Sequence, residues 1–195
     1  MGDSLLVLRR ATERDLDVIT GLIGGAVDWL RTQNTDQWAQ PWPSEEGRRH
    51  RILTDLQAGT SWILWDEDGL PVATITANPE GGPIWPRETR RDPAVYAGRL
   101  VVSRSHAGRG LGSALLDWAG LSGRQQFAAR WVRVDVWTTN IVLHEYYRQQ
   151  GFEFWGVSET IRHYPSAALF QKATERISPP ERFLFRLSDG NGRCR

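Results

Sequence analysis

The chain has 195 residues, a length that suits one domain with a single buried core. Its 24 basic and 23 acidic residues leave a net charge of +1, so no overall field favours nucleic acid or a membrane surface as a partner. The single cysteine, Cys194, cannot form a disulfide within the chain, and no apolar run is long enough for a signal peptide or a membrane span. We therefore expect a cytoplasmic protein.

Apolar periodicity and turn residues predict strands alternating with helices along the chain. Their order mixes hairpins with strand-helix-strand crossovers, which predicts a single α/β domain with a mixed sheet and helices on both faces. Proline-rich and turn-rich segments at 34–43 and 78–93 are expected to be loops. Strands are expected at 5–8, 61–65, 71–77, 95–103, 131–137, 152–157 and 167–172, and helices at 12–30, 44–58, 111–121 and 141–150.

The domain is expected to cover residues 1–175, and residues 176–195 form a C-terminal extension. Within the extension, Phe183, Phe185 and Leu187 alternate as in a short strand, and the last residues are expected to be disordered.

Three glycines, Gly108, Gly110 and Gly112, lie between an expected strand and an amphipathic helix. Glycines let a backbone approach a ligand closely, and the start of a helix presents unpaired N–H groups, so this loop predicts an anion site. It is not a nucleotide-binding P-loop, because the only lysine is Lys172. The dinucleotide fingerprint also fails, because no glycine or alanine falls at its last position. The remaining alternative is a turn that binds nothing.

A second motif follows, in which Asn140, Tyr147, Gly151 and Phe152 are spaced as N-x6-Y-x3-G-F. Together, the two motifs resemble those of the Gcn5-related N-acetyltransferase (GNAT) family over roughly residues 5–174. The resemblance implies a three-layer fold around a mostly antiparallel sheet, with acetyl-coenzyme A as the co-substrate.

The resemblance also implies a coenzyme site along the strand edge, the glycine loop and the second motif. Ala107 departs from the Gln or Arg that the family carries at the start of its loop, and Arg109 offers charge-assisted hydrogen bonds to phosphate instead. The implied coenzyme-binding residues are Leu100, Val101, Val102, Ala107, Gly108, Arg109, Gly110, Leu111, Gly112, Ser113, Asn140 and Tyr147.

The same resemblance makes Tyr147 the general acid that protonates the departing thiolate. The alternative is that Tyr147 is a core aromatic residue, and its neighbour Tyr146 is expected to serve in core or surface packing. Asn140 is expected either to cap its helix or to contact the coenzyme. The strand before the loop lacks the Glu that many family members carry, which leaves an acceptor amine deprotonated through water or one of three acids as the base: Asp135, Glu88 and Asp92.

For the acceptor we expect a small-molecule or peptide amine, attacked directly in a ternary complex. Tryptophans in or near loops, together with Asp135, are candidates for the acceptor wall: Trp29, Trp38, Trp85 and Trp137. The histidines and the cysteine form no ligand set, so no metal is expected. Two other functions stay open, a coenzyme-A-binding module without turnover and an O-acetyltransferase. A homodimer is also compatible with the expected sheet edges.

Overall fold

The computed structural model describes residues 6–180, 184–189 and 193–194. Its helices are α1 (Leu16–Leu30), α2 (Glu45–Gln57), α3 (Leu111–Phe127) and α4 (Ile141–Gln149). Its strands are β1 (Val7–Arg10), β2 (Ser61–Trp65), β3 (Pro71–Asn78), β4 (Ala94–Val102), β5 (Trp131–Val136), β6 (Glu153–Val157), β7 (Ala168–Ala173), β8 (Arg186–Asp189) and β9 (Arg193–Cys194).

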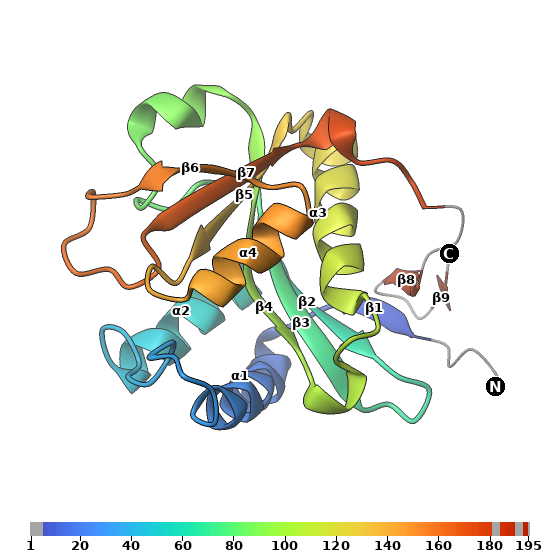
Figure 1. Ribbon diagram of the computed structural model, residues 1–195. Helices are drawn as coiled ribbons and strands as arrows, with labels where there is room; N and C mark the ends of the chain where they lie inside the picture. The colour runs from blue at the N-terminus through green and yellow to red at the C-terminus, as the bar shows by residue number, and fades with distance from the viewer. Residues whose placement is uncertain (1–5, 181–183, 190–192, 195) are drawn as a thin grey trace.

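The described strands form one sheet in the order β6-β7-β5-β4-β3-β2-β1-β8-β9 (Figure 1). Most neighbours pair antiparallel, whereas β4 with β5 and β1 with β8 pair parallel. The parallel β4–β5 pair requires a crossover, and α3 supplies it. The mixed, mostly antiparallel sheet predicted from the sequence is confirmed.

The sheet divides the core into two layers, because alternate side chains of a strand point to opposite faces. On β5, Val132, Val134 and Val136 join the apolar cluster that contains α3 and Tyr147 of α4. On β4, Val101 joins the opposite cluster, with residues of α1 and α2. Helices therefore cover both faces, as the sequence predicts.

Helix α3 is longer than the predicted 111–121, and its glycines explain the difference. A Cβ on Gly123 would lie 2.9 Å from Val95, so this glycine permits close approach of the helix to β4 and does not end the helix. The helix ends at Phe127, and Ala128 follows it in the left-handed region with φ 51°.

The long loop before β4 is less open than its sequence suggests. It contains a short 3₁₀ helix, Arg87–Arg91. Trp85 is only 1% exposed, so it is a core residue and the expectation that it lines the acceptor wall is wrong. Its ring is enclosed by Tyr96, Trp155 and the guanidinium of Arg133, 5.9, 6.0 and 5.1 Å away.

The described part of the C-terminal extension packs on the domain. Ile177 and Phe185 are buried in the apolar cluster of α3, and β8 adds to the sheet beside β1. A short strand is therefore present as expected, but it begins at Arg186, after Phe185, and contains Leu187. Phe183 lies outside the described residues. The expected disorder falls on residues 190–192 and 195, also outside the described part, and on Arg193 and Cys194, which form β9.

No helix in the described ranges is both long and apolar enough to cross a membrane.

Candidate active site

Strands β4 and β5 separate part of the way along their length. Their parallel pairing covers Ala94 to Tyr96 on β4, and ends at Tyr96 opposite Arg133. Beyond this point β4 continues to Val102 and β5 to Val136. The two strands therefore open a gap between them on the side where α3 begins.

A bulge in β4 accompanies the separation. Thr74 of β3 pairs with Val101, but Thr76 pairs with Gly98, so β4 holds one extra residue in this stretch. Arg99 lies in the bulge with φ 45°, a conformation uncommon outside glycine. Its guanidinium is held by the carboxylate of Asp55 on α2 and donates to the hydroxyl of Thr76 at 3.1 Å. These contacts fix a strained residue beside the gap.

The edge of β4 that faces the gap offers main-chain groups to a ligand. Ser103 donates its N–H to Val72 on the β3 side at 2.8 Å. Because main-chain groups alternate between the two edges of a strand, those of Leu100 and Val102 point toward the gap and those of Val101 toward β3. An extended chain bearing amide groups can pair with this edge as an added strand would.

The glycine loop lies at the end of the same strand. Gly108 and Gly110 have φ 77° and 74°, and Gly110 is the residue that precedes the first turn of α3. Gly108, Arg109 and Gly110 are all exposed. The first N–H groups of a helix lack partners within it, so those of Leu111, Gly112 and Ser113 form a cradle for an anion. Ala107 lies just before the loop and is partly buried.

Tyr147 of α4 lies in the layer that contains α3. It is 8% exposed, and its ring contacts Phe152, Phe170 and Tyr146 at centroid distances of 5.4, 6.2 and 5.4 Å. Burial raises the pKa of Tyr147 above its ordinary range, with smaller contributions from Tyr146 and from the charge of Asp135. No described residue accepts a hydrogen bond from its hydroxyl. The group therefore keeps its proton at neutral pH and has a free donor.

Asn140 begins α4 and holds the loop between α1 and α2. Its Oδ1 accepts from the N–H of Leu143 at 3.0 Å, so the capping role is confirmed, whereas a coenzyme contact stays a prediction. Its Nδ2 donates to Gln37 at 2.6 Å. The neighbouring Asp36 accepts from Trp137 Nε1 at 2.9 Å and from Thr139 at 2.5 Å. The turn between β5 and α4 is thus tied to the loop over the gap.

Asp135 lies on the other face of the gap. Its neighbours Val134 and Val136 point into the α3 layer, so Asp135 points to the α1–α2 side, where it accepts a hydrogen bond from Tyr164 at 3.1 Å. Burial raises the pKa of the Asp135 carboxyl, and the hydrogen bond from Tyr164 and the charge of Arg99 act in the opposite direction. The other acids considered, Glu88 and Asp92, lie in the long loop and at its end.

The four tryptophans considered for the acceptor wall take different positions. Trp85 is enclosed in the core and offers no open face. Trp29 is 36% exposed and packs under the guanidinium of Arg104 at 4.1 Å, beside the glycine loop. Trp38, with φ 59°, packs against the α1–α2 layer. Trp137 is buried, with its Nε1 bonded to Asp36 as described above.

Three residues that sequence reasoning missed lie at this site: Arg51, Arg99 and Tyr164. Arg51 contacts Trp42, and Trp42 in turn packs edge-on against Tyr164 with centroids 4.8 Å apart. The spacing of Arg48, Arg51 and Asp55 along α2 places polar groups on one helix face, which is the signal that would have found Arg51. Nothing in the local sequence marks Tyr164.

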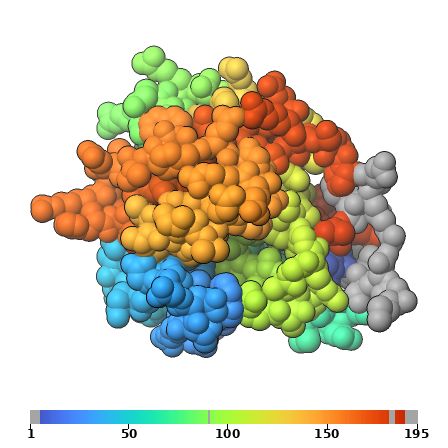
Figure 2. Space-filling view, viewed as in Figure 1, coloured from blue at the N-terminus to red at the C-terminus, as the bar shows by residue number. Residues whose placement is uncertain are grey.

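The gap opens onto a hollow in the molecular surface (Figure 2). The hollow is bounded by α4 in orange, by the blue segment of α1 and the following loop, and by the yellow-green start of α3. The glycine loop, the gap and the α1–α2 loop therefore meet on one face of the molecule.

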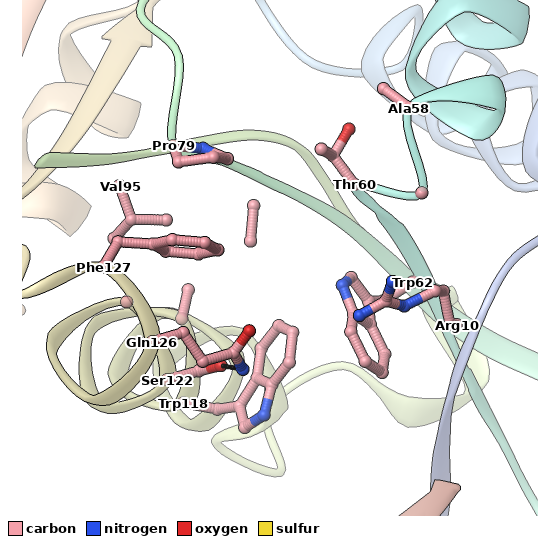
Figure 3. Close-up of a pocket in the computed structure, with 14 residues that line it drawn as sticks. Arg10, Ala58, Thr60, Trp62, Pro79, Val95, Trp118, Ser122, Gln126 and Phe127 are labelled. Atoms are coloured by element: carbon pink, nitrogen blue, oxygen red, sulfur yellow. Dashed lines mark hydrogen bonds between the residues drawn. The ribbon is translucent and has the colours of Figure 1, made fainter. Parts of the chain in front are cut away.

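A separate pocket of about 240 Å³ lies at the far end of α3 (Figure 3). Trp118 and Trp62 meet there edge-to-face at 4.9 Å, and Arg10 stacks on Trp62 at 5.0 Å. Phe127 and Val95 line its other side. The wall contains none of the predicted site residues, so this pocket is distinct from the gap.

Comparison with known proteins agrees with this geometry. The family model described as "Acetyltransferase (GNAT) family" matches residues 25–152. A curated relative, the uncharacterized N-acetyltransferase YesJ of Bacillus subtilis, is 29% identical over 167 residues, which cover 83% of this chain and 87% of the relative.

Solved structures share the fold. A GNAT acetyltransferase from Listeria monocytogenes has a TM-score of 0.68 at 21% identity, with 86% of this chain and 94% of that chain covered. YncA from Salmonella typhimurium, a putative acetyltransferase solved with acetyl-CoA, has a TM-score of 0.58 at 17% identity, with 90% and 98% covered.

The fold and the family model thus define an acetyltransferase, with a splayed sheet next to a glycine loop. The chain belongs to the GNAT acetyltransferase family.

Proposed function

We propose that this acetyltransferase transfers the acetyl group of acetyl-CoA to a primary amine of a small molecule or peptide, by direct attack in a ternary complex. The observation that carries the proposal is the gap between β4 and β5, because it lies between the anion cradle of α3 and an acidic side chain on the opposite face. The family uses acetyl-CoA, and YncA was solved with it.

The residues around the gap fit this coenzyme. The exposed loop of Gly108 to Gly110 and the first turn of α3 would hold its pyrophosphate, with Arg109 adding a positive charge. The free main-chain groups of Leu100 and Val102 would pair with the amides of the pantetheine arm, beside Val101. Ala107, Leu111, Gly112, Ser113 and Asn140 would complete the cradle.

When bound, acetyl-CoA supplies the acetyl group: the amine nitrogen bonds to the acetyl carbon, the carbon–sulfur bond breaks, and the sulfur leaves with the electron pair. Tyr147 would then give its phenolic proton to the sulfur, and proton transfer of this kind is worth on the order of a hundred- to ten-thousandfold in rate. The raised pKa of Tyr147 supports this role, because it keeps the proton in place until the thiolate forms.

The test is a thiol-release assay with acetyl-CoA and a panel of amines, run beside calorimetric titration of the coenzyme. We expect Tyr147→Phe to bind the coenzyme as the wild type does and to lose at least about a hundredfold in kcat. Tyr96→Phe is the matched control, since the Tyr96 hydroxyl already accepts a hydrogen bond from Arg133 at 3.1 Å. Full activity of Tyr147→Phe would overturn the assignment of the acid.

The same assay separates the alternatives. Coenzyme binding without thiol release on any acceptor would favour the binding module, and release only with alcohols would favour an O-acetyltransferase. Absence of coenzyme binding would contradict the interpretation of the glycine loop itself.

A further inference from the structure

The wall of the gap opposite Tyr147 contains a continuous series of contacts from an acid to a base. Asp135 accepts a hydrogen bond from Tyr164 at 3.1 Å. Tyr164 packs edge-on against Trp42 at 4.8 Å, and the guanidinium of Arg51 lies 5.4 Å from the centre of the Trp42 ring. These residues come from β5, from the loop before β7, from the α1–α2 loop and from α2, so only the folded chain brings them together.

Arg51 carries a positive charge without a counterion. It donates to the carbonyl of Trp42 and stacks on that ring, and no carboxylate in the described part of the chain pairs with it. The neighbouring arginines are paired, Arg99 with Asp55 and Arg48 with Glu45. Burial is the largest effect that lowers the pKa of Arg51, whereas Tyr164 and the charge of Asp55 act in the opposite direction. An acidic group on a ligand would give Arg51 the carboxylate partner that it lacks among the described residues.

Asp135 supplies the opposite charge at the other end of the series. It lies on β5 at the gap, where an acceptor amine must arrive to meet the thioester. Tyr164 and Arg99 face this carboxylate, and its charge also reaches Tyr147 across the gap. A protonated amine beside Asp135 would be held by charge and placed for reaction.

From this arrangement we propose that the acceptor is a small zwitterion, a primary amine that also carries a carboxylate or similar acidic group, with its ammonium at Asp135 and its acid at Arg51. The inference rests on the proposed function and names the substrate class of the same site. Polyamines do not fit it, because a second positive charge would meet Arg51.

With the ammonium group at Asp135, the proton transfers of the reaction balance. The ammonium gives one proton to the carboxylate of Asp135 and becomes the neutral amine that attacks. After the nitrogen–carbon bond forms, the nitrogen loses a second proton to water and Asp135 returns its proton to solvent, while Tyr147 protonates the sulfur and recovers its proton from solvent. The products are the N-acetyl acid, free coenzyme A and one net proton.

The experiment compares ω-amino acids with alkylamines of the same chain length, from two to five carbons, as acceptors in the thiol-release assay. We expect kcat/KM to be about ten- to a hundredfold higher for the amino acid of the best length, the effect of a hydrogen bond to a charged group. Arg51→Gln should bring that ratio close to one, mainly by lowering kcat/KM for the amino acid, and Arg51→Lys should restore part of it.

Arg49→Gln is the matched control on the same helix, because Arg49 pairs with Asp17 at the surface at 3.0 Å. A ratio near one in the wild type, or an equal loss for both acceptors in Arg51→Gln, would overturn the inference while leaving the acetyltransferase proposal standing. Should no amine release thiol, calorimetry with the best-binding amino acid decides: binding that Arg51→Gln abolishes supports the zwitterion site, and absence of binding rejects it.

Discussion

The hydroxyl of Tyr146 occupies the space that a side chain at position 112 would need. A Cβ added to Gly112 would lie 2.7 Å from this hydroxyl and 3.9 Å from Leu100. Tyr146 on α4 therefore packs on the first turn of α3, beside the free edge of β4. The sequence alone assigned Tyr146 to general packing, whereas its contact lies at the entrance to the proposed coenzyme site.

This contact predicts that Gly112→Ala displaces Tyr146 and weakens coenzyme binding. The side chain can move because its far end is the atom in conflict, so we expect a loss of only about 1 kcal/mol in the free energy of unfolding, at the low end for overpacking. The dissociation constant for acetyl-CoA, measured by calorimetry, should rise by roughly tenfold, as one lost contact of about 1.4 kcal/mol implies.

The double variant Gly112→Ala/Tyr146→Phe should recover much of the loss, because it removes the conflicting oxygen. Gly24→Ala in α1 is the control, since nothing lies within 4 Å of a Cβ there, and it should stabilise the protein by about 0.5–1 kcal/mol. If the double variant binds acetyl-CoA no more tightly than Gly112→Ala does, displacement of Tyr146 is not the cause of the weaker binding.

A second glycine of α3 is required by packing against the sheet. A Cβ on Gly120 would overlap Ile177 and lie 2.7 Å from Val132, both buried. We expect Gly120→Ala to cost about 1–3 kcal/mol in urea unfolding. Ile177→Val removes the terminal carbon in conflict, so the double variant should lose less than the sum of the two single losses. Simple additivity would contradict the packing of Ile177 against α3.

The parts of the site that depend on local spacing could be predicted from the sequence. The glycine loop and the N-x6-Y-x3-G-F motif are such local patterns, because a strand-to-helix turn and a helix face are set by residues close together in the chain. The helix length beyond Leu121 could not be predicted, since Gly123 serves contact with Val95 on another element.

The parts that depend on distant partners could not be predicted. Tyr164 reaches Asp135 across 29 positions of sequence, and Trp42 joins them from the loop between α1 and α2. The burial of Trp85 likewise depends on Arg133 and Tyr96, which its own proline-rich surroundings do not reveal. Tertiary contacts of this kind determine where charged side chains lie around the gap, and local sequence does not contain them.

The ties between Asp36 and the β5–α4 turn predict a role in acceptor binding. Asp36→Ala removes both bonds, from Thr139 and from Trp137, and should loosen the loop that carries Trp38 and Trp42. We expect a several-fold rise in KM for the acceptor with kcat little changed, together with faster hydrogen exchange in residues 34–43. Asp28→Ala is the control, because Asp28 pairs at the surface with the exposed Arg31. Unchanged hydrogen exchange in residues 34–43 would show that the bonds of Asp36 do not hold this loop in place.

The hydrogen bonds that Asp36 accepts also determine how its contribution to stability changes with pH. The hydrogen bonds from Thr139 and then Trp137 lower the pKa of Asp36, so its ionised form is favoured in the folded state. Its contribution to stability is therefore present above the ordinary carboxyl pKa and is lost as the pH falls through the lowered folded value. Asp36→Asn should therefore have a lower free energy of unfolding than the wild type at neutral pH, and the two values should converge in strong acid.

Asp135 should show the opposite dependence. Burial raises its pKa, so the folded state favours the protonated carboxyl, and the free energy of unfolding that Asp135 contributes is highest below the ordinary carboxyl pKa. This contribution falls as the pH rises toward the raised folded value. In urea unfolding, Asp135→Asn should therefore be more stable than the wild type at pH 8 and lose that advantage as the pH is lowered toward 4.

The activity should increase as Asp135 ionises, whereas its contribution to stability decreases. The reason is that only the ionised Asp135 can hold and deprotonate an ammonium group. We expect the kcat/KM for the acceptor to fall as the pH drops through the raised pKa of Asp135. In Asp135→Asn, kcat/KM should be low at every pH while coenzyme binding is retained. A variant whose stability advantage grows toward acid would mean that Arg99 and Tyr164 stabilise the carboxylate more than burial destabilises it, and the assignment of Asp135 as the proton acceptor would then fail.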